Sequence, residues 1–367
     1  MKIPVLLGGA ALTRDYAEET LAELYRGPLL YCKDAFEGLH AMDEISRGAV
    51  SAAVARQRDR AQRRKTLRAE SEKKFAHILA GEPAESSVAR DNPIPDPPFW
   101  GPVVVEKISP RQVYPFINKT AVFTGQWGFK QKGMFPEEYR RLIAEKAEPV
   151  FEALKRRAMD EKLIEPKVAY GYFPVQSEGE DVIVYRLDEF QPASRAPLGR
   201  PRELLRFTLP RQTSRRRLCI ADFFRSKQSG EFDVLGLQLV TVGDRATQAA
   251  EILRQADKYQ DYLFLHGFGV ESAEGLAEFW HKYVRQELGF GSEDGASIEE
   301  LFHQRYRGSR YSFGYPACPN LEDRAKIFQM LKAETIGVQL SENFMLVPEQ
   351  STDSLIVHHP QAKYFDT

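Results

Sequence analysis

The segment Arg310-Tyr-Ser-Phe-Gly-Tyr-Pro-Ala-Cys-Pro319 is the most informative stretch of this 367-residue sequence. Pro316 and Pro319 each have a fixed φ, whereas Gly314 can take conformations that other residues avoid. Helix-breaking residues crowded in this way predict a rigid, tightly turned loop. Arg310 stands beside the loop, and its guanidinium group can bond both oxygens of a carboxylate. The segment therefore predicts a site for a small anion such as a carboxylate.

The composition is typical of a globular protein with one large domain or two smaller ones. Apolar residues make up 43% of the sequence and charged residues 28%, and the net charge is −1. A nearly neutral chain gives no electrostatic reason to expect nucleic acid or an anionic membrane as a partner. No apolar run approaches the length of a membrane span. We therefore expect no nucleic-acid and no membrane partner.

The cysteines Cys32, Cys219 and Cys318 are odd in number and far apart. This argues against a disulfide framework and predicts a reducing, cytoplasmic setting. None lies in a Cys-x-x-Cys or His-rich context, so no metal site is predicted. We interpret Cys318 as a small buried side chain rather than a nucleophile, because no base is apparent nearby.

The histidines are given no metal role either. His358 and His359 are adjacent, so in an extended segment their side chains face opposite ways. His266 and His281 fall in helical patterns, where we interpret them as packing or surface residues.

The first part of the chain follows a β-α-β-α order. Apolar runs at residues 3–7 and 29–32 each precede a helical pattern, at about 13–24 and 35–56. This order is typical of an open parallel sheet. Two parallel strands enclose little core, so we interpret residues 1–55 as a partial α/β doubly wound domain.

Residues 56–97 are expected to connect two domains. Residues 56–74 are strongly basic without interleaved aromatic residues, which favours a solvated helix or exposed connector over a nucleic-acid arm. A docking surface for an acidic redox protein is a minor alternative. Residues 81–98 are rich in proline and predict an extended linker that ends where Phe99-Trp100 anchors the next domain.

Residues 98–367 mix strand and helix patterns without regular alternation, which predicts an α+β domain with a mainly antiparallel sheet and helices. Strands are expected at residues 168–174, 182–185, 205–209 and 235–242, of which the first two form a hairpin. Helices are expected from Pro136 with a kink near Pro149, over 245–285 with an interruption at Gly267-Phe-Gly269, after the N-cap Ser297, and over 320–332 with Asn320 as N-cap and a stop at Gly337.

The same region resembles the AdoMet-binding activation domain of cobalamin-dependent methionine synthase. Most of the matching stretches are weak singly, but they occur in the family's order over residues 98–367. They are Phe116-Ile-Asn-Lys-Thr-Ala-Val-Phe-Thr-Gly-Gln-Trp127, Tyr170-Gly-Tyr-Phe-Pro174, Ala221-Asp-Phe223, Leu276-Ala-Glu278, the Arg310 segment, Ser341-Glu-Asn-Phe-Met345 and His359-Pro-Gln-Ala-Lys-Tyr-Phe365.

The resemblance implies roles for three polar residues in an AdoMet site. Arg310 matches the arginine that pairs with the ligand carboxylate, and Glu278 matches an acidic residue that holds the ammonium. Asn118 stands where the best-known members carry an aspartate, and a neutral amide is a weaker acceptor than a carboxylate. The alternatives are a surface arginine that caps a helix, an exposed helix carboxylate and a turn-forming asparagine.

Aromatic and backbone groups complete the implied site. Tyr364 and Phe365 match a pair of tyrosines near the adenosine, and Phe365 keeps the ring but lacks the hydroxyl. The alternative for Tyr364 is a packed terminal residue. The remaining residues expected to line the pocket are Tyr311, Ser312, Gly314 and Tyr315.

The beginning of the chain resembles the end of the same enzyme's cobalamin-binding domain, through Ile3-Pro-Val-Leu-Leu-Gly-Gly-Ala10 and Tyr31-Cys-Lys-Asp-Ala35. In that family, residues matching Gly8, Gly9 and Ala35 lie beside the cobalamin tail. The Asp-x-His-x-x-Gly motif, whose histidine binds cobalt, is absent from this sequence. We therefore expect a C-terminal fragment or one half of a split enzyme, with cobalamin supplied through the missing portion or a partner.

The function that the resemblance implies is the reactivation module of methionine synthase, a component of a methyltransferase. Such a module binds S-adenosyl-L-methionine for the reductive methylation of cob(II)alamin in methionine biosynthesis. It acts with the cobalamin-bearing portion in cis or in trans and with a flavodoxin-like electron donor. No catalytic residue is expected, because the domain acts by positioning, from a shallow site on the concave side of the sheet.

The isolated chain is not expected to complete homocysteine methylation. The alternative function is a stand-alone AdoMet-binding module without turnover, either a sensor or a remnant.

Overall fold

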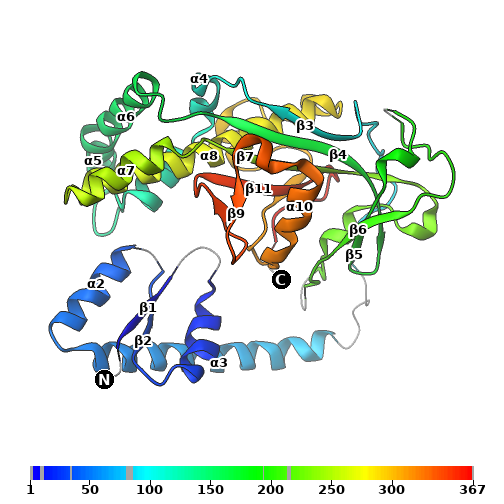
Figure 1. The fold of residues 1–367 in the computed structure, drawn as a ribbon. Helices are drawn as coiled ribbons and strands as arrows, with labels where there is room; N and C mark the ends of the chain where they lie inside the picture. Colours follow the sequence, from blue (N-terminus) through cyan, green and yellow to red (C-terminus); the bar gives the residue numbers. More distant parts are fainter. Residues whose placement is uncertain are drawn as a thin grey trace. The chain divides into compact units, whose positions relative to one another are not determined.

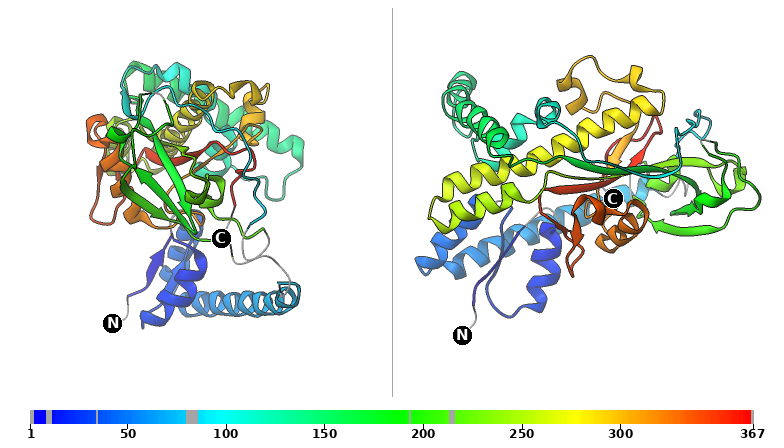
Figure 2. Two further views of the ribbon diagram at one scale, coloured as in Figure 1. Left: turned by 90° about the vertical axis from the view of Figure 1, so that its right-hand side faces the viewer. Right: turned by 45° about the horizontal axis from the view of Figure 1, so that its top comes forward.

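The computed structural model describes residues 3–8, 12–33, 35–79, 86–192, 194–212 and 216–365. Its contacts divide the chain into two compact units (Figures 1 and 2). The smaller unit comprises Met1–Glu85 with Thr213–Arg217, and the larger comprises Ser86–Gln212 with Leu218–Thr367. Within the described ranges, no helix is long and apolar enough to cross a membrane.

The smaller unit is a short parallel sheet with helices. Strand β1 (Val5–Leu7) pairs in parallel with β2 (Leu29–Tyr31), which confirms the expected β-α-β order. A π-helical stretch, Tyr16–Leu21, leads into α1, and the helices are α1 (Ala22–Leu24), α2 (Ala35–Ser46) and α3 (Val50–Leu79).

The prediction of one helix over 35–56 is wrong. Gly48 has a φ of +72° between α2 and α3, and a left-handed residue ends a helix. Helix α3 begins at Val50 and continues through the basic residues 56–74, so this stretch is helical, as one of the two interpretations held.

The larger unit is built on one antiparallel sheet, which confirms the predicted α+β class. Of the described residues, seven strands join this sheet in the order β6-β5-β4-β7-β11-β8, with β3 beside β4, and every pairing is antiparallel. The strands are β3 (Gly101–Val105), β4 (Lys167–Glu178), β5 (Asp181–Tyr185), β6 (Glu203–Thr208), β7 (Asp233–Thr241), β8 (Ser309–Tyr311) and β11 (Ser351–Val357). A separate small pair joins β9 (Gln339–Leu340) to β10 (Leu346–Val347).

The helices of the larger unit are α4 (Pro110–Val113), α5 (Pro136–Leu142), α6 (Glu148–Asp160), α7 (Arg245–Gln255), α8 (Tyr259–Glu287), α9 (Ile298–Phe302) and α10 (Arg324–Leu331). A π-helical stretch, Ile143–Ala147, joins α5 to α6 next to the predicted kink at Pro149. The side chains of Ser297 and Asn320 accept backbone N–H groups, which confirms both predicted N-caps. Helix α10 ends before Gly337, because Lys332 takes a φ of +54°.

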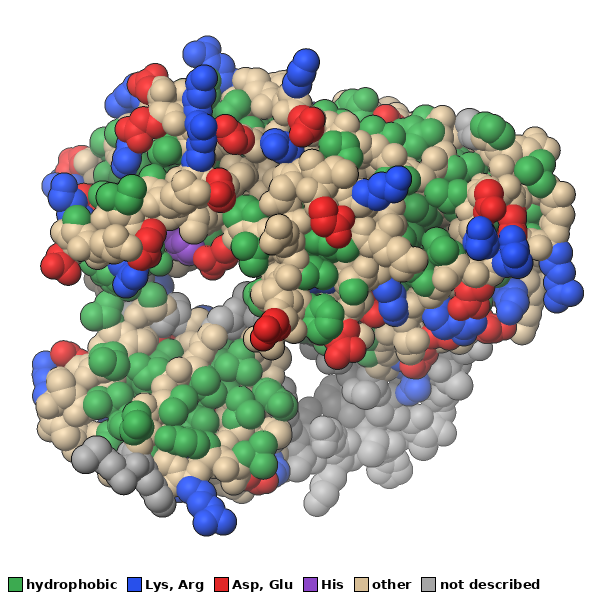
Figure 3. Space-filling model, viewed as in Figure 1, with side chains coloured by type: hydrophobic (Ala, Val, Ile, Leu, Met, Phe, Trp, Pro, Cys, Tyr) green, Lys and Arg blue, Asp and Glu red, His purple; other side chains and the backbone are tan. Residues whose placement is uncertain are grey.

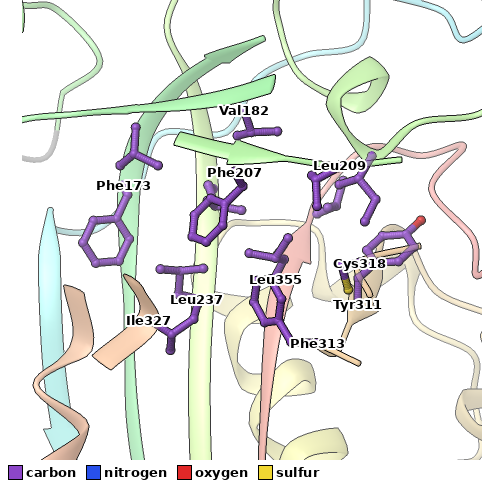
Figure 4. Close-up of a cluster of buried hydrophobic side chains, with 14 of the residues drawn as sticks. Phe173, Val182, Phe207, Leu209, Leu237, Tyr311, Phe313, Cys318, Ile327 and Leu355 are labelled. Atoms are coloured by element: carbon purple, nitrogen blue, oxygen red, sulfur yellow. The ribbon is translucent and has the colours of Figure 1, made fainter. Parts of the chain in front are cut away.

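Alternation along the central strands gives the sheet two apolar faces. On β4, Tyr170 and Tyr172 pack in the cluster that contains Phe268 of α8, whereas Phe173 packs in the cluster that contains Ile327 of α10. Figure 1 shows α8 and α10 on opposite sides of these strands. Figure 4 shows side chains from β4, β7 and β11 gathered around Ile327. The larger unit therefore has one core on each side of its sheet.

The prediction that Gly267-Phe-Gly269 interrupts a helix is wrong. Helix α8 is continuous there, and the break lies between α7 and α8, where Asp257 has a φ of +57°. A Cβ on Gly267 would lie 2.6 Å from the Cβ of Gln126 and 3.2 Å from ring atoms of Trp127. Gly267 therefore permits close packing of α8 on the π-helical stretch Ala121–Gln126, rather than a bend.

Residues 86–97, which we expected in the linker, belong to the larger unit. Val88 is buried in the core on the α10 side. The backbone of Ala89 is bonded twice, with its N–H donating to Gln361 Oε1 at 2.7 Å and its carbonyl 2.8 Å from Nε2 of His359. Composition alone identified an extended segment here, but the segment is held because its backbone groups find side-chain partners.

We predict that Gly267→Ala destabilises the larger unit by roughly 1–3 kcal/mol, since the added methyl group meets a Cβ that cannot move aside. Gly125→Ala is the matched control, because nothing lies within 4 Å of a Cβ at that position. Thermal unfolding followed by circular dichroism should show a lower Tm for the first variant only. Equal Tm values for the two variants would contradict the packing assignment.

The charge of Glu271 gives a second prediction. Burial raises the pKa of Glu271 to about 7, although its Oε1 accepts a hydrogen bond from Gln126 Nε2 at 3.0 Å. The folded state therefore binds the proton more tightly than the unfolded chain, so this group's stabilising contribution is complete below about pH 4.5 and is lost as the pH rises through about 7.

We predict that Glu271→Gln, which keeps the acceptor for Gln126, raises the free energy of unfolding at pH 8 by roughly 1–3 kcal/mol. The gain should shrink toward pH 5, where the folded wild type is already protonated at this position. Urea unfolding at both pH values measures the effect. The same pH dependence in wild type and variant would disprove the shift.

Candidate functional site

Arg310 lies on β8, the last strand in the order of the main sheet, directly before the loop that the sequence predicts. Its register is fixed by pairing with Ile356 of β11. Because neighbours on a strand face opposite ways, Tyr311 enters the core on the α10 side and Arg310 faces α8. There its Nη2 donates to Oε2 of Glu278 at 2.9 Å. The two residues predicted to bind the amino-acid end of a ligand are thus brought together.

Both partners keep buried atoms without a hydrogen bond. Glu278 Oε1 and Arg310 Nε have no partner among the described residues, and the two side chains are 9% and 17% exposed. Burial by itself would lower the pKa of Arg310, but Glu278, Tyr306 and Glu274 raise the pKa above the usual arginine value. The pair therefore presents a charged donor and an acceptor that a polar ligand could satisfy.

The loop after β8 is as tightly turned as the sequence predicts. Gly314 has a φ of +93°, its N–H donates to the Cys318 carbonyl at 3.0 Å, and the Cys318 N–H donates to the Tyr315 carbonyl at 2.9 Å. Cys318 is buried, its Sγ donates to the Ser312 carbonyl, and burial raises the pKa of its thiol. This agrees with a small packing residue rather than a nucleophile.

A second arginine, which the sequence did not single out, fixes the same loop. Arg324 of α10 donates from Nη2 to the Phe313 carbonyl at 3.1 Å and from Nε to Asp353 at 3.0 Å. Asp353 lies on β11, so the loop is tied to both a helix and a strand.

The aromatic candidates fall into two groups. Tyr315 and Tyr364 are each 43% exposed, so their rings are accessible. Phe365 is 8% exposed, and its ring centre lies 5.8 Å from that of Tyr311, so it supports the core under β8. The Tyr311 hydroxyl donates to the carbonyl of Lys363, which positions the backbone just before Tyr364.

Asn118 makes the contacts of a turn residue. Its Oδ1 accepts the N–H groups of Thr120 at 3.1 Å and Ala121 at 3.3 Å. The preceding backbone packs on α8, where a Cβ on Gly275 would lie 3.1 Å from the Ile117 nitrogen. The backbone at Ile117 therefore crosses α8 at Gly275, one helical turn before Glu278. Asn118 is the next residue of this backbone.

A cavity of about 860 Å³ adjoins Asn118, between α4, α6 and α9. Its walls include Arg111, Tyr114, Arg156 and Phe302. Of the described candidate residues only Asn118 lines it, so this cavity is distinct from the Arg310–Glu278 pair.

The candidates of the smaller unit follow its two strands. A Cβ on Gly8 would lie 2.5 Å from the carbonyl oxygen of Cys32, which requires glycine at the end of β1. Ala35 is exposed and begins α2 after β2. Since β1 and β2 are parallel neighbours, Gly8 and Ala35 lie at the same edge. Gly9 lies outside the described residues.

Sequence reasoning missed Arg285, the largest fully buried side chain in the described part of the chain. It lies on α8, two turns after Glu278, and its Nη1 is 3.9 Å from Glu278 Oε1. Its other nitrogens donate to both carboxylate oxygens of Asp294, and its guanidinium lies 3.9 Å from the ring centre of Tyr306. The available signal was the seven-residue spacing of Glu278 and Arg285, which places the two opposite charges on the same face of α8.

The histidines have structural partners. His281 is buried with its ring 5.1 Å from that of Tyr306, and burial together with Arg285 and Arg310 lowers the pKa of His281, so it is neutral. His358 Nε2 lies 2.6 Å from Oδ1 of the buried Asp233. Among the residues that the structure describes, no group of three or more His, Cys, Asp or Glu side chains could hold a metal ion.

Comparisons with known proteins agree with this architecture. Residues 110–367 match the family model described as "Vitamin B12 dependent methionine synthase, activation domain". A crystal structure of the MetH reactivation domain bound to AdoHcy is similar, with a TM-score of 0.65 and 25% identity, over 76% of this chain and 85% of that chain.

Two similar curated proteins are methionine synthases. That of Mycobacterium tuberculosis (strain ATCC 25618 / H37Rv) is 42% identical over 389 residues, and that of Mycobacterium leprae (strain TN) is 40% identical over 392 residues. Each alignment covers 100% of this chain but 32% of the relative, so the chain spans about a third of their length. The chain belongs to the family of vitamin B12 dependent methionine synthase activation domains.

Proposed function

We propose that the larger unit binds S-adenosyl-L-methionine at Arg310 and Glu278 and serves the reductive methylation of cob(II)alamin. The observation that carries the proposal is a buried ion pair with one unsatisfied donor, Arg310 Nε, and one unsatisfied acceptor, Glu278 Oε1. The amino-acid end of S-adenosyl-L-methionine offers a carboxylate to the first and an ammonium to the second. When bound, this ligand supplies an electrophilic methyl group on its sulfonium.

The fit is chemical as well as geometric. A buried donor or acceptor without a partner costs about 1–3 kcal/mol, so a ligand that pairs both atoms recovers that cost on binding. The guanidinium is a planar fork that suits a carboxylate, and β8 holds it in register with β11. Arg310 and Glu278 therefore orient the ligand, and neither needs to exchange a proton.

The other candidates surround this pair. We assign the exposed rings of Tyr315 and Tyr364 to the adenosine, and the backbone of Tyr311, Ser312 and Gly314 to its polar edge. Phe365 acts beneath the site by supporting Tyr311. Asn118 is the outermost member, and its amide would have to leave the turn contacts described above to reach the ligand.

Cobalamin is assigned to a further part of a longer protein or to a partner, in cis or in trans. The smaller unit exposes Ile3, Leu24, Leu39 and Met42, which are 68%, 75%, 55% and 56% exposed, and Figure 3 shows apolar side chains gathered on its visible face. Ile3 precedes β1, Leu24 lies on α1, and Leu39 and Met42 lie on α2. Exposed apolar side chains beside a two-stranded parallel sheet suit packing against more of a doubly wound domain. Gly8, Gly9 and Ala35 would then adjoin the cobalamin tail.

The remaining assignments follow from the family. The whole enzyme would transfer a methyl group to homocysteine in the cytoplasm, and a flavodoxin-like protein would supply the electron. Acidic and basic side chains are interspersed on the face of the larger unit that Figure 3 shows, so this face has no surface of a single sign where such a donor would dock.

We predict that Arg310→Ala weakens S-adenosyl-L-methionine binding by at least about a hundredfold, because a charged bidentate contact is lost and Glu278 is left unpaired. Isothermal titration calorimetry measures the affinity, and far-UV circular dichroism checks the fold. Arg254→Ala is the control, because Arg254 pairs with Glu251 at the exposed end of α7, on another element than Arg310. An affinity for Arg310→Ala equal to that of wild type would refute the clamp.

A second measurement separates the proposed function from an AdoMet-binding module without turnover. The chain is mixed with a cobalamin-loaded fragment of a similar methionine synthase and a reductant, and transfer of labelled methyl from S-adenosyl-L-methionine to the cobalamin is followed. Transfer that depends on Arg310 supports the reactivation role. Binding without transfer supports the sensor or remnant.

A further inference from the structure

Four charged side chains alternate in sign through the interior of the larger unit. Asp294 accepts two hydrogen bonds from Arg285, at 2.6 and 2.9 Å, and Arg285 Nη1 lies 3.9 Å from Glu278 Oε1. The other oxygen of Glu278 accepts from Arg310 at 2.9 Å. Glu278 is therefore held between two guanidinium groups, one on each oxygen.

Arg285 is more firmly fixed than Arg310. Arg285 is fully buried, is gripped by both oxygens of Asp294 and is stacked on Tyr306 at 3.9 Å. Arg310 is 17% exposed, and among the described residues its side chain makes one hydrogen bond, to Glu278. A glutamate side chain has several rotatable bonds, so its orientation is set by the partner that cannot move. That partner is Arg285.

The charges around the pair leave a surplus that favours an anion. Arg285, Arg310 and Lys363 are cations, and the Nζ of Lys363 donates to the carbonyls of Gln304 and Tyr306. The buried carboxylates facing them are Glu278 and Asp294, and the nearby His281 is neutral. With the half-buried Lys363 counted, these five charged side chains carry one more positive than negative charge, and the exposed Glu274 also acts on Arg310.

We propose that Arg285 is a positioning residue that holds Glu278 against Arg310, and thereby makes the site selective for ligands that carry an α-carboxylate. The inference rests on the proposed function, since it concerns the same site. Arg285 does not touch the ligand. Arg310 Nε has no hydrogen bond, and the 3.9 Å separation leaves Glu278 Oε1 without one, so both buried atoms keep the capacity to bond the ligand.

A purely structural role for Arg285 is the competing explanation, because Asp294 lies on the segment that follows α8. The chain contains a matched control for that role. Arg307 also lies over an aromatic ring, that of Phe290 at 4.9 Å, and also pairs with the same segment, through Glu293 at 3.3 Å. Its other contacts are the carbonyls of His358 and Pro93, so it ties the same region without touching Glu278.

The experiment compares two ligands that differ only in the carboxylate. S-adenosyl-L-methionine and its decarboxylated analogue, which keeps the sulfonium and the ammonium, are titrated calorimetrically into the 367-residue chain. Wild type should prefer the first ligand. Arg285→Met should reduce that preference about tenfold, mostly by weakening S-adenosyl-L-methionine binding. Arg307→Met should keep the preference even where its Tm falls by as much.

Two further variants cover a failure of Arg285→Met to fold. Arg285→Lys keeps the charge but cannot grip Asp294 with a planar fork, and Asp294→Asn loosens the anchor alone. Both variants should lower the preference for S-adenosyl-L-methionine over the decarboxylated analogue, by less than Arg285→Met does. Equal weakening of both ligands in all three variants, or an unchanged preference, would overturn the positioning role. No binding of S-adenosyl-L-methionine to wild type would instead remove the proposed function itself.

Discussion

The buried contact between Glu278 and Arg310 is the interaction on which the site depends. It joins the long helix α8 to the last strand in the order of the main sheet, through two residues that are 32 positions apart in the chain. A charge taken out of water must be paired, and removing one partner of a buried pair typically costs about 3–5 kcal/mol. The contact therefore fixes the position of β8 against α8, and the tight loop follows directly from that strand.

The two-faced sheet explains how one short strand serves both stability and function. Tyr311 enters the core beneath α10, while Arg310, one residue earlier, faces α8. A shift of one residue in the pairing between β8 and β11 would exchange these faces, placing a guanidinium in the core and a phenol at the site. The register is protected by the hydrogen bond from Tyr311 to Lys363 and by the clamp that Arg324 places on Phe313.

The fold class could be predicted because strand and helix patterns follow one another without regular alternation. Arg310 and Glu278 could be predicted as a pair because the stretches that contain them match the family's motifs in order. The sequence led to a wrong prediction where one residue type can serve two structural purposes. Gly267 could break a helix or allow close packing, and only the presence of Gln126 opposite decides between them. Arg285 was missed because charged residues are expected at the surface, and nothing local announces a partner such as Asp294. Strand β11 was not predicted because it begins with the polar stretch Ser351-Thr-Asp-Ser354, which pairs with β7.

Residues 86–93 are hydrogen-bonded to the C-terminal tail and to Arg225. Ala89 is bonded to His359 and Gln361, and the carbonyls of Arg90 and Asn92 accept hydrogen bonds from Arg225. The same stretch of the C-terminal tail leads, five residues after His359, to Tyr364. Displacing residues 86–93 therefore breaks the hydrogen bonds that hold the C-terminal tail in place. By the same linkage, forming these bonds holds residues 86–93 in place. A pull on residues 86–93 would therefore act on the backbone that leads to Tyr364, one of the proposed ligand contacts.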